Sequence, residues 1–275
     1  MQKPIFINNS VVIVIFFLIT FATNISLYPG VAYGHATPVS YSPPANAVIS
    51  TQQQGKSLPD KVVILFSERP EPKVSYIHIT DSENKRMDNN DFKITGQNDR
   101  EATVTLDKSK LSDGVYSVSW LVLSRDDGHI TKGSYVFNIQ PPQSQQLQEI
   151  ILSGQKANVF SESAVVDNVN LTLIITPFYV GQNTFNVTLI NESGTSPINI
   201  RNVILSFSNQ EAEIGPIIAN LNKTGQGEFS AQGSYLSQPG NWEIGVTAQR
   251  SKAYDLNHAF ETMVKAPTIN NMTSS

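Results

Sequence analysis

The sequence contains no cysteine among its 275 residues. This absence excludes disulfide frameworks, thiolate metal sites and thiol catalysis. Lysine and arginine number 19 against 23 acidic residues and form no basic cluster, so nothing indicates nucleic acid as a partner. Charged residues are also scarce, at 15%. Much of the remaining sequence consists of Ser, Thr, Asn, Gln and β-branched residues. This mixture is typical of many short strands with polar outer faces.

Long apolar runs are confined to the N-terminus. An apolar segment covers residues 11–21, and Ala32 and Gly34 then supply the small residues that precede a cut before His35. We therefore expect residues 1–34 to be a signal peptide, although an uncleaved membrane anchor is the alternative because the apolar region is nearly long enough to span a bilayer. Cleavage would give an exported protein, periplasmic, pseudo-periplasmic or extracellular, whose mature form does not span a membrane.

The rest of the chain alternates short strand-like segments with turn signals, and no stretch keeps a 3.6-residue period long enough for a substantial helix. We expect two tandem immunoglobulin-like or Greek-key β-sandwich domains, so the predicted fold class is all-β. The domains are residues 35–140 and 169–265. A polar linker that starts with two prolines, residues 141–168, separates them, with a short helix left open in its second half. Residues 266–275 form a disordered tail. The predicted strands are residues 61–67, 74–80, 102–106, 115–123 and 134–139, then 170–176, 184–191, 200–208, 228–235 and 242–249.

Three residues suggest a metal site. Asp127 and His129 are two positions apart, so in an extended chain both side chains would point the same way. Cleavage before His35 would give that residue a free amine beside its imidazole, and the two groups can chelate one ion. Three nitrogens and one oxygen in a plane suit Cu(II), which should bind more tightly than Zn(II) or Ni(II). Cu(I) is less suited, because it prefers sulfur ligands and the few methionines are widely scattered.

Several segments carry a family resemblance in a fixed order. They are the opening His-Ala-Thr-Pro-Val-Ser-Tyr-Ser-Pro-Pro-Ala-Asn-Ala at 35–47, Leu-Phe-Ser-Glu at 65–68, Leu-Ser-Asp-Gly-Val-Tyr-Ser-Val-Ser-Trp at 111–120, Ser124, Asp-Gly-His at 127–129 and Gly-Ser-Tyr-Val-Phe at 133–137. Together they make residues 35–139 resemble the CopC family of periplasmic copper-binding proteins.

The resemblance implies a Cu(II) site made of His35, Asp127 and His129, with Glu68 near the site but not among its ligands. The chain departs from the family pattern in two ways. One extra residue precedes the Asp-Gly-His motif, so Asp126 competes with Asp127 as the oxygen ligand. The methionine-rich Cu(I) site of some members is absent, which puts copper shuttling between two sites in doubt.

The second domain resembles the YtkA-like, immunoglobulin-type domains that often accompany CopC domains. The carrying segments are Ile-Thr-Pro at 175–177, Gly-Gln-Asn-Thr-Phe-Asn-Val-Thr-Leu at 181–189, Gly-Gln-Gly-Glu-Phe at 225–229 and Gly-Asn-Trp-Glu-Ile at 240–244. This match implies a fold more than any chemistry.

The expected function is that of a non-enzymatic, extracytoplasmic protein that holds Cu(II) for sequestration, buffering or delivery. The resemblance implies a membrane copper transporter as a partner. Two alternatives stay open. One is a copper-dependent oxidase with a histidine brace, similar to lytic polysaccharide monooxygenases, which needs an open coordination position. The other is a metal-free structural or adhesive protein, in which His35 and His129 never meet.

Overall fold

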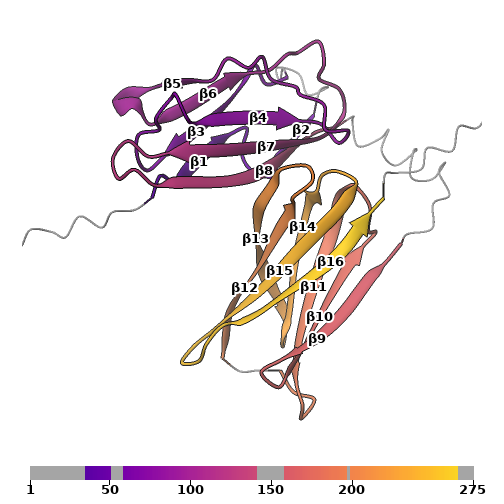
Figure 1. Ribbon diagram of the computed structural model, residues 1–275. Helices are drawn as coiled ribbons and strands as arrows, with labels where there is room; N and C mark the ends of the chain where they lie inside the picture. Colours follow the sequence, from indigo (N-terminus) through magenta and orange to yellow (C-terminus); the bar gives the residue numbers. More distant parts are fainter. Residues whose placement is uncertain (1–34, 51–57, 141–157, 197–198, 266–275) are drawn as a thin grey trace, which may run out of the picture. The chain divides into compact units, whose positions relative to one another are not determined.

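Figure 1 shows the computed structural model, which describes residues 35–50, 58–140, 158–196 and 199–265. The signal peptide predicted for residues 1–34 and the tail predicted for residues 266–275 lie outside this range. The described chain consists of β-strands and one short 3₁₀ helix, η1 (Gln97–Asp99), which confirms the all-β prediction. None of its segments is a helix with the length and hydropathy needed to cross a membrane.

The first domain is a sandwich of two four-stranded sheets with a shared core. Every strand pair is antiparallel except β2–β8. One sheet has the order β1 (Pro38–Ser42), β3 (Lys61–Phe66), β6 (Glu101–Thr105) and β5 (Lys93–Thr95). The other has the order β2 (Val48–Ser50), β8 (Ile130–Gln140), β7 (Gly114–Leu123) and β4 (Tyr76–Thr80).

The core of this domain is formed by the apolar residues that alternate with polar ones along its strands. Along β3, Val62, Ile64 and Phe66 are buried while the residues between them are more exposed, as expected for a strand with one face inside. Trp120 on β7 is also buried, and its ring lies edge-on to Phe66 at 5.3 Å between centroids. Opposite it on β8 stands Gly133, where a Cβ atom would lie only 2.7 Å from the Trp120 ring.

A tyrosine ties the start of β7 to the loop before it. The buried Tyr116 hydroxyl donates to the Ser112 carbonyl oxygen at 2.6 Å and accepts from the Ser112 backbone N–H at 2.8 Å. A tyrosine that bonds back to the backbone a few residues upstream is a recurring feature of immunoglobulin-like sandwiches.

The second domain is built on one eight-stranded antiparallel sheet. Its core contains Phe185 and Phe207, whose rings meet edge-on at 5.0 Å, and Trp242, whose indole N–H donates to the Gln238 carbonyl oxygen. The strand order is β16 (Leu256–Val264), β15 (Gly240–Arg250), β12 (Ile200–Asn209), β13 (Ile214–Gly225), β14 (Glu228–Leu236), β11 (Gly181–Asn191), β10 (Val169–Thr176) and β9 (Phe160–Val166).

The linker prediction is wrong for part of its length. Phe160–Val166 forms strand β9, which pairs with β10, instead of a linker or a short helix. Only Phe160 is fully buried in β9. β9 stands at the edge of its sheet, where polar and charged side chains are common because they discourage further pairing, so its polar sequence concealed it. Residues 141–157 of the predicted linker lie outside the described residues.

Candidate metal centre

Asp127 and His129 lie in the turn that joins β7 to β8. The turn is closed by the Ser124 backbone N–H, which donates to the His129 carbonyl oxygen at 2.9 Å, and by the Gly128 N–H, which donates to the Ser124 carbonyl oxygen at 3.1 Å. Gly128 has φ +77°, a conformation that favours glycine. The expected extended geometry is therefore wrong. The two side chains converge because a turn folds them together, and the Asp127 Oδ1 accepts the His129 backbone N–H at 2.9 Å.

His35 is brought to this turn by the residues that follow it. Ala36 is fully buried, and its carbonyl oxygen accepts the Thr131 hydroxyl at 2.7 Å. The Ser67 hydroxyl donates to the His35 carbonyl oxygen at 3.0 Å and accepts the Thr37 backbone N–H at 2.9 Å, and the Ser67 backbone N–H donates to the Thr37 carbonyl oxygen at 2.8 Å. The segment that leads into β1 is thus bonded to both sheets of the first domain, and it holds the His35 backbone beside the β7–β8 turn.

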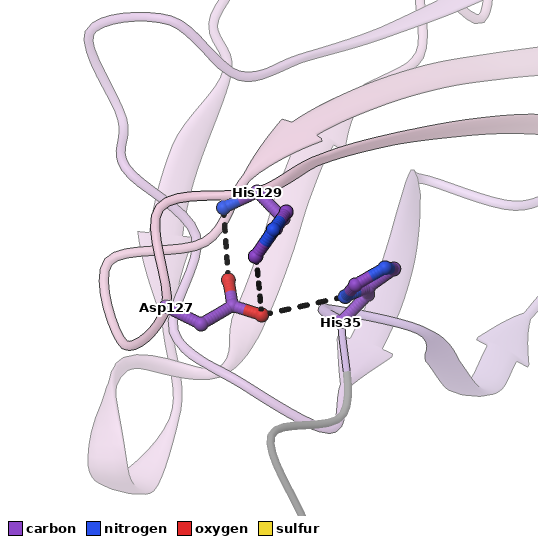
Figure 2. Close-up of side chains that lie close together, drawn as sticks. All are labelled: His35, Asp127 and His129. Carbon is purple, nitrogen blue, oxygen red and sulfur yellow. Dashed lines mark hydrogen bonds and ion pairs between the residues drawn. The ribbon is translucent and has the colours of Figure 1, made fainter.

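The three predicted ligands meet around one oxygen atom. The Asp127 Oδ2 lies 3.1 Å from the Nδ1 of His129 and 3.4 Å from the Nδ1 of His35. Figure 2 shows the carboxylate directed at both imidazole rings. The two rings stack on each other, with 4.6 Å between centroids and 26° between planes. Residues 92 positions apart in the chain therefore share one cluster.

The carboxylate is ionised in this cluster. The His129 backbone N–H, followed by the His129 imidazole, the Ser124 hydroxyl and the His35 imidazole, lowers the pKa of Asp127 from 3.8 to about 2, although burial opposes this shift. The Asp127 side chain is only 3% exposed, whereas those of His35 and His129 are 54% and 60% exposed. The cluster therefore has a buried anion at its base and two accessible imidazoles above it.

The donor atoms suit a metal ion. Two donors bound at about 2.0–2.1 Å to one ion stand about 2.9–3.4 Å apart when the angle between them is about 90–110°. The two nitrogen-to-oxygen distances fall in that range, and one donor atom from each residue can be chosen so that all lie within 4.8 Å of one another. Within the described ranges, this is the one group of three His, Asp or Glu residues with such a spacing.

Asp126 and Glu68 face other partners. The Asp126 carboxylate accepts the Arg69 backbone N–H at 2.9 Å and the Arg69 Nε–H at 2.7 Å. Glu68 accepts the Ser124 hydroxyl at 2.6 Å, so it contacts the turn but none of the three clustered side chains. Nothing in the local sequence indicated that Arg69 would pair with Asp126.

The fold and the cluster define an all-β protein in which two imidazoles and one carboxylate lie together at the end of a sandwich. The chain belongs to the CopC family, because the CopC domain matches residues 39–140. The structure of CopC from Methylosinus trichosporium OB3b is 32% identical over 40% of this chain and 97% of that one, with a TM-score of 0.34.

Two further comparisons concern solved structures of lower identity. PcoC, a methionine-rich copper resistance protein from Escherichia coli, is 22% identical over 39% of this chain and all of its own, with a TM-score of 0.30. A tetra-tandem repeat from the extending region of a large adhesion protein is 14% identical over 80% of this chain and 49% of its own, with a TM-score of 0.26. A comparison with curated proteins finds no match. The YtkA-like assignment of the second domain stays a prediction.

Proposed function

We propose that this chain binds Cu(II) through the imidazoles of His35 and His129, the carboxylate of Asp127 and, once residues 1–34 are removed, the α-amine of His35. It holds the ion outside the cytoplasm for sequestration, buffering or delivery. The observation that carries this proposal is the convergence of both Nδ1 atoms on the Asp127 Oδ2. Membership in a family whose solved relatives are copper resistance proteins supports copper as the ion.

The donor set favours Cu(II) over other ions. Nitrogen and oxygen donors in one plane suit Cu(II), which also stands at the top of the divalent affinity series. The chain offers no cysteine sulfur, and Met87, the one methionine of the described part of the first domain, is buried in the core away from the ligand turn. A site of this kind releases protons as it fills, because imidazoles and amines must be unprotonated to bind.

The exposure of the proposed ligands fits a site from which the ion is passed on to a partner. Asp127 is fixed by the turn, while the imidazoles of His35 and His129 are open to solvent, so a partner could remove the ion by exchanging ligands one at a time. We propose a membrane copper transporter as that partner. The oxidase alternative needs an open coordination position, and the amine, two imidazoles and carboxylate together would fill a four-coordinate plane.

The test is a Cu(II) titration followed by EPR on two matched proteins. One begins at His35, and the other carries a single alanine before His35, which converts the amine into a peptide nitrogen. We expect tight one-to-one binding with a three-nitrogen, one-oxygen spectrum in the first protein only. Equal and weak binding by both would remove the proposed site. Mass spectrometry of the exported chain tests separately whether the mature protein begins at His35.

A further inference from the structure

We propose that the ion pair between Arg69 and Asp126 is a positioning element, which assigns copper binding to Asp127 and keeps the neighbouring carboxylate of Asp126 out of the site. This inference rests on the proposed Cu(II) function. It concerns two carboxylates that stand side by side in the chain, of which the turn presents only one to the histidines.

The contacts of Asp126 occupy its whole carboxylate. Its Oδ2 accepts the Arg69 backbone N–H at 2.9 Å, and its Oδ1 accepts both the Nε–H and an Nη2–H of the same arginine. A guanidinium presents these donors in a rigid planar fork, so the pair fixes orientation as well as charge. Both oxygens of Asp126 are therefore engaged by Arg69, and neither bonds to the imidazoles of His35 or His129.

The segment that carries Arg69 also pairs with the backbone of the turn. The Arg125 N–H donates to the Arg69 carbonyl oxygen at 2.8 Å, and Pro70 and Ser124 form an isolated β-bridge. The Ser124 hydroxyl accepts the backbone N–H groups of Asp126 and Asp127 at 3.0 and 3.2 Å. The turn is thus held by the backbone of the Arg69 segment and by the Ser124 hydroxyl.

This arrangement decides which carboxylate meets the imidazoles. With Asp126 held against Arg69, the next side chain in the turn, Asp127, is directed at His35 and His129. Without the arginine, the turn would carry two neighbouring carboxylates, and nothing in the contacts of Asp126 would keep it from Cu(II). Outer partners that orient metal ligands typically contribute about 10–100-fold to metal affinity.

The experiment compares Arg69→Ala with Arg125→Ala in protein that begins at His35. Arg125 is the matched control: it lies next to Asp126 in the turn, and its replacement removes the same charge, but its contact is with Glu71, at 3.6 Å, and not with Asp126. We expect Arg69→Ala to weaken Cu(II) binding by about 10–100-fold and to give two overlapping EPR spectra, one for each carboxylate. Arg125→Ala should keep one spectrum and the original affinity.

A double variant separates competition from simple loosening of the turn. Adding Asp126→Asn to Arg69→Ala removes the competing carboxylate, so a single EPR spectrum should return. Amide exchange measured by NMR in the copper-free proteins gives a second readout. The N–H groups of Ser124 and Gly128, which close the turn, should exchange faster in Arg69→Ala than in Arg125→Ala.

The outcomes distinguish this inference from the proposed function. If the unmodified protein binds no Cu(II), the proposed function fails and this assignment fails with it. If the unmodified protein binds Cu(II) and Arg69→Ala binds it equally well with one spectrum, only the positioning role is overturned. Equal losses in Arg69→Ala and Arg125→Ala would also overturn it, because net charge would then explain the effect.

Discussion

Asp127→Asn is the sharpest perturbation of the proposed site, because asparagine has the shape of aspartate. Its amide oxygen can still accept the His129 backbone N–H that Asp127 Oδ1 accepts at 2.9 Å, so the turn should keep its form. The second oxygen, which lies 3.1 and 3.4 Å from the two imidazole nitrogens, becomes an NH₂ group. That group donates hydrogen bonds and does not bind a cation. The variant therefore removes one ligand and changes little else.

The expected loss of Cu(II) affinity exceeds that for an outer partner, so it should be at least about 100-fold. Competition with a chelator measures the affinity, and EPR reports whether an oxygen ligand has been lost. Asp126→Asn is the matched control, one residue away with the same chemical change, and it should bind Cu(II) far more tightly than Asp127→Asn. Full affinity in Asp127→Asn together with a large loss in Asp126→Asn would show that the oxygen ligand has been assigned to the wrong residue.

Three further predictions concern the scaffold. Gly133→Ala places a Cβ atom 2.7 Å from the buried Trp120 ring, and we expect this overpacking to cost about 1–3 kcal/mol in thermal or urea unfolding; an unchanged midpoint would refute the contact. Tyr116→Phe leaves the Ser112 N–H and carbonyl oxygen without their partner and should cost about 1–3 kcal/mol in the same assay, whereas a neutral result would mean that water replaces the hydroxyl. Because the folded-state pKa of Asp127 is lowered from 3.8 to about 2, its carboxylate stabilises the copper-free domain above pH 4 and loses that contribution as the pH falls toward 2. The stability difference between wild type and Asp127→Asn, measured by urea unfolding at several pH values, should shrink over that interval, and a constant difference would contradict the shift.

Strands with one buried face were predictable from sequence alone. The alternation in Lys61–Phe66 and the β-branched and aromatic residues of Gly114–Leu123 gave β3 and β7 nearly to their observed ends. The strand β13 (Ile214–Gly225) was not predicted, because a glycine and a proline near its start indicate a turn and asparagines break its apolar pattern. The strand β16 (Leu256–Val264) was not predicted either, and its sequence mixes asparagine, histidine and glutamate with the apolar residues.

Short strands were harder to predict, for a physical reason. The strands β2 (Val48–Ser50) and β5 (Lys93–Thr95) have three residues each, too few to display a period. Their conformation comes from the longer strands beside them, β8 for β2 and β6 for β5, which supply the hydrogen-bond partners. Pairing between segments that are distant in the chain depends on the tertiary structure, so it cannot be predicted from a short window of sequence.

His35, Asp127 and His129 lie together in the structure, but the extended backbone from which we expected this is not the one observed. An extended chain and a tight turn can both place the side chains of residues i and i+2 on one side. Gly128, which lies between Asp127 and His129, has a positive φ and therefore belongs to a turn. Alternation along a strand would have placed Asp127 and His129 about 7 Å apart at the backbone with no direct bond between them. The observed turn adds the bond from the His129 N–H to the Asp127 carboxylate, which lowers the pKa of that carboxylate.

The choice between Asp126 and Asp127 shows where local sequence stops being informative. Two adjacent aspartates have the same chemistry, and either could precede a glycine and a histidine in a metal-binding turn. What separates them is Arg69, which lies 57 positions before Asp126 and reaches it only after β3 and the β7–β8 turn have packed together. A basic residue in a proline-rich segment is an ordinary surface feature when read alone. Its contact with Asp126 exists only in the folded domain, so the choice that we propose between the two carboxylates depends on the tertiary structure and not on the Asp-Gly-His motif.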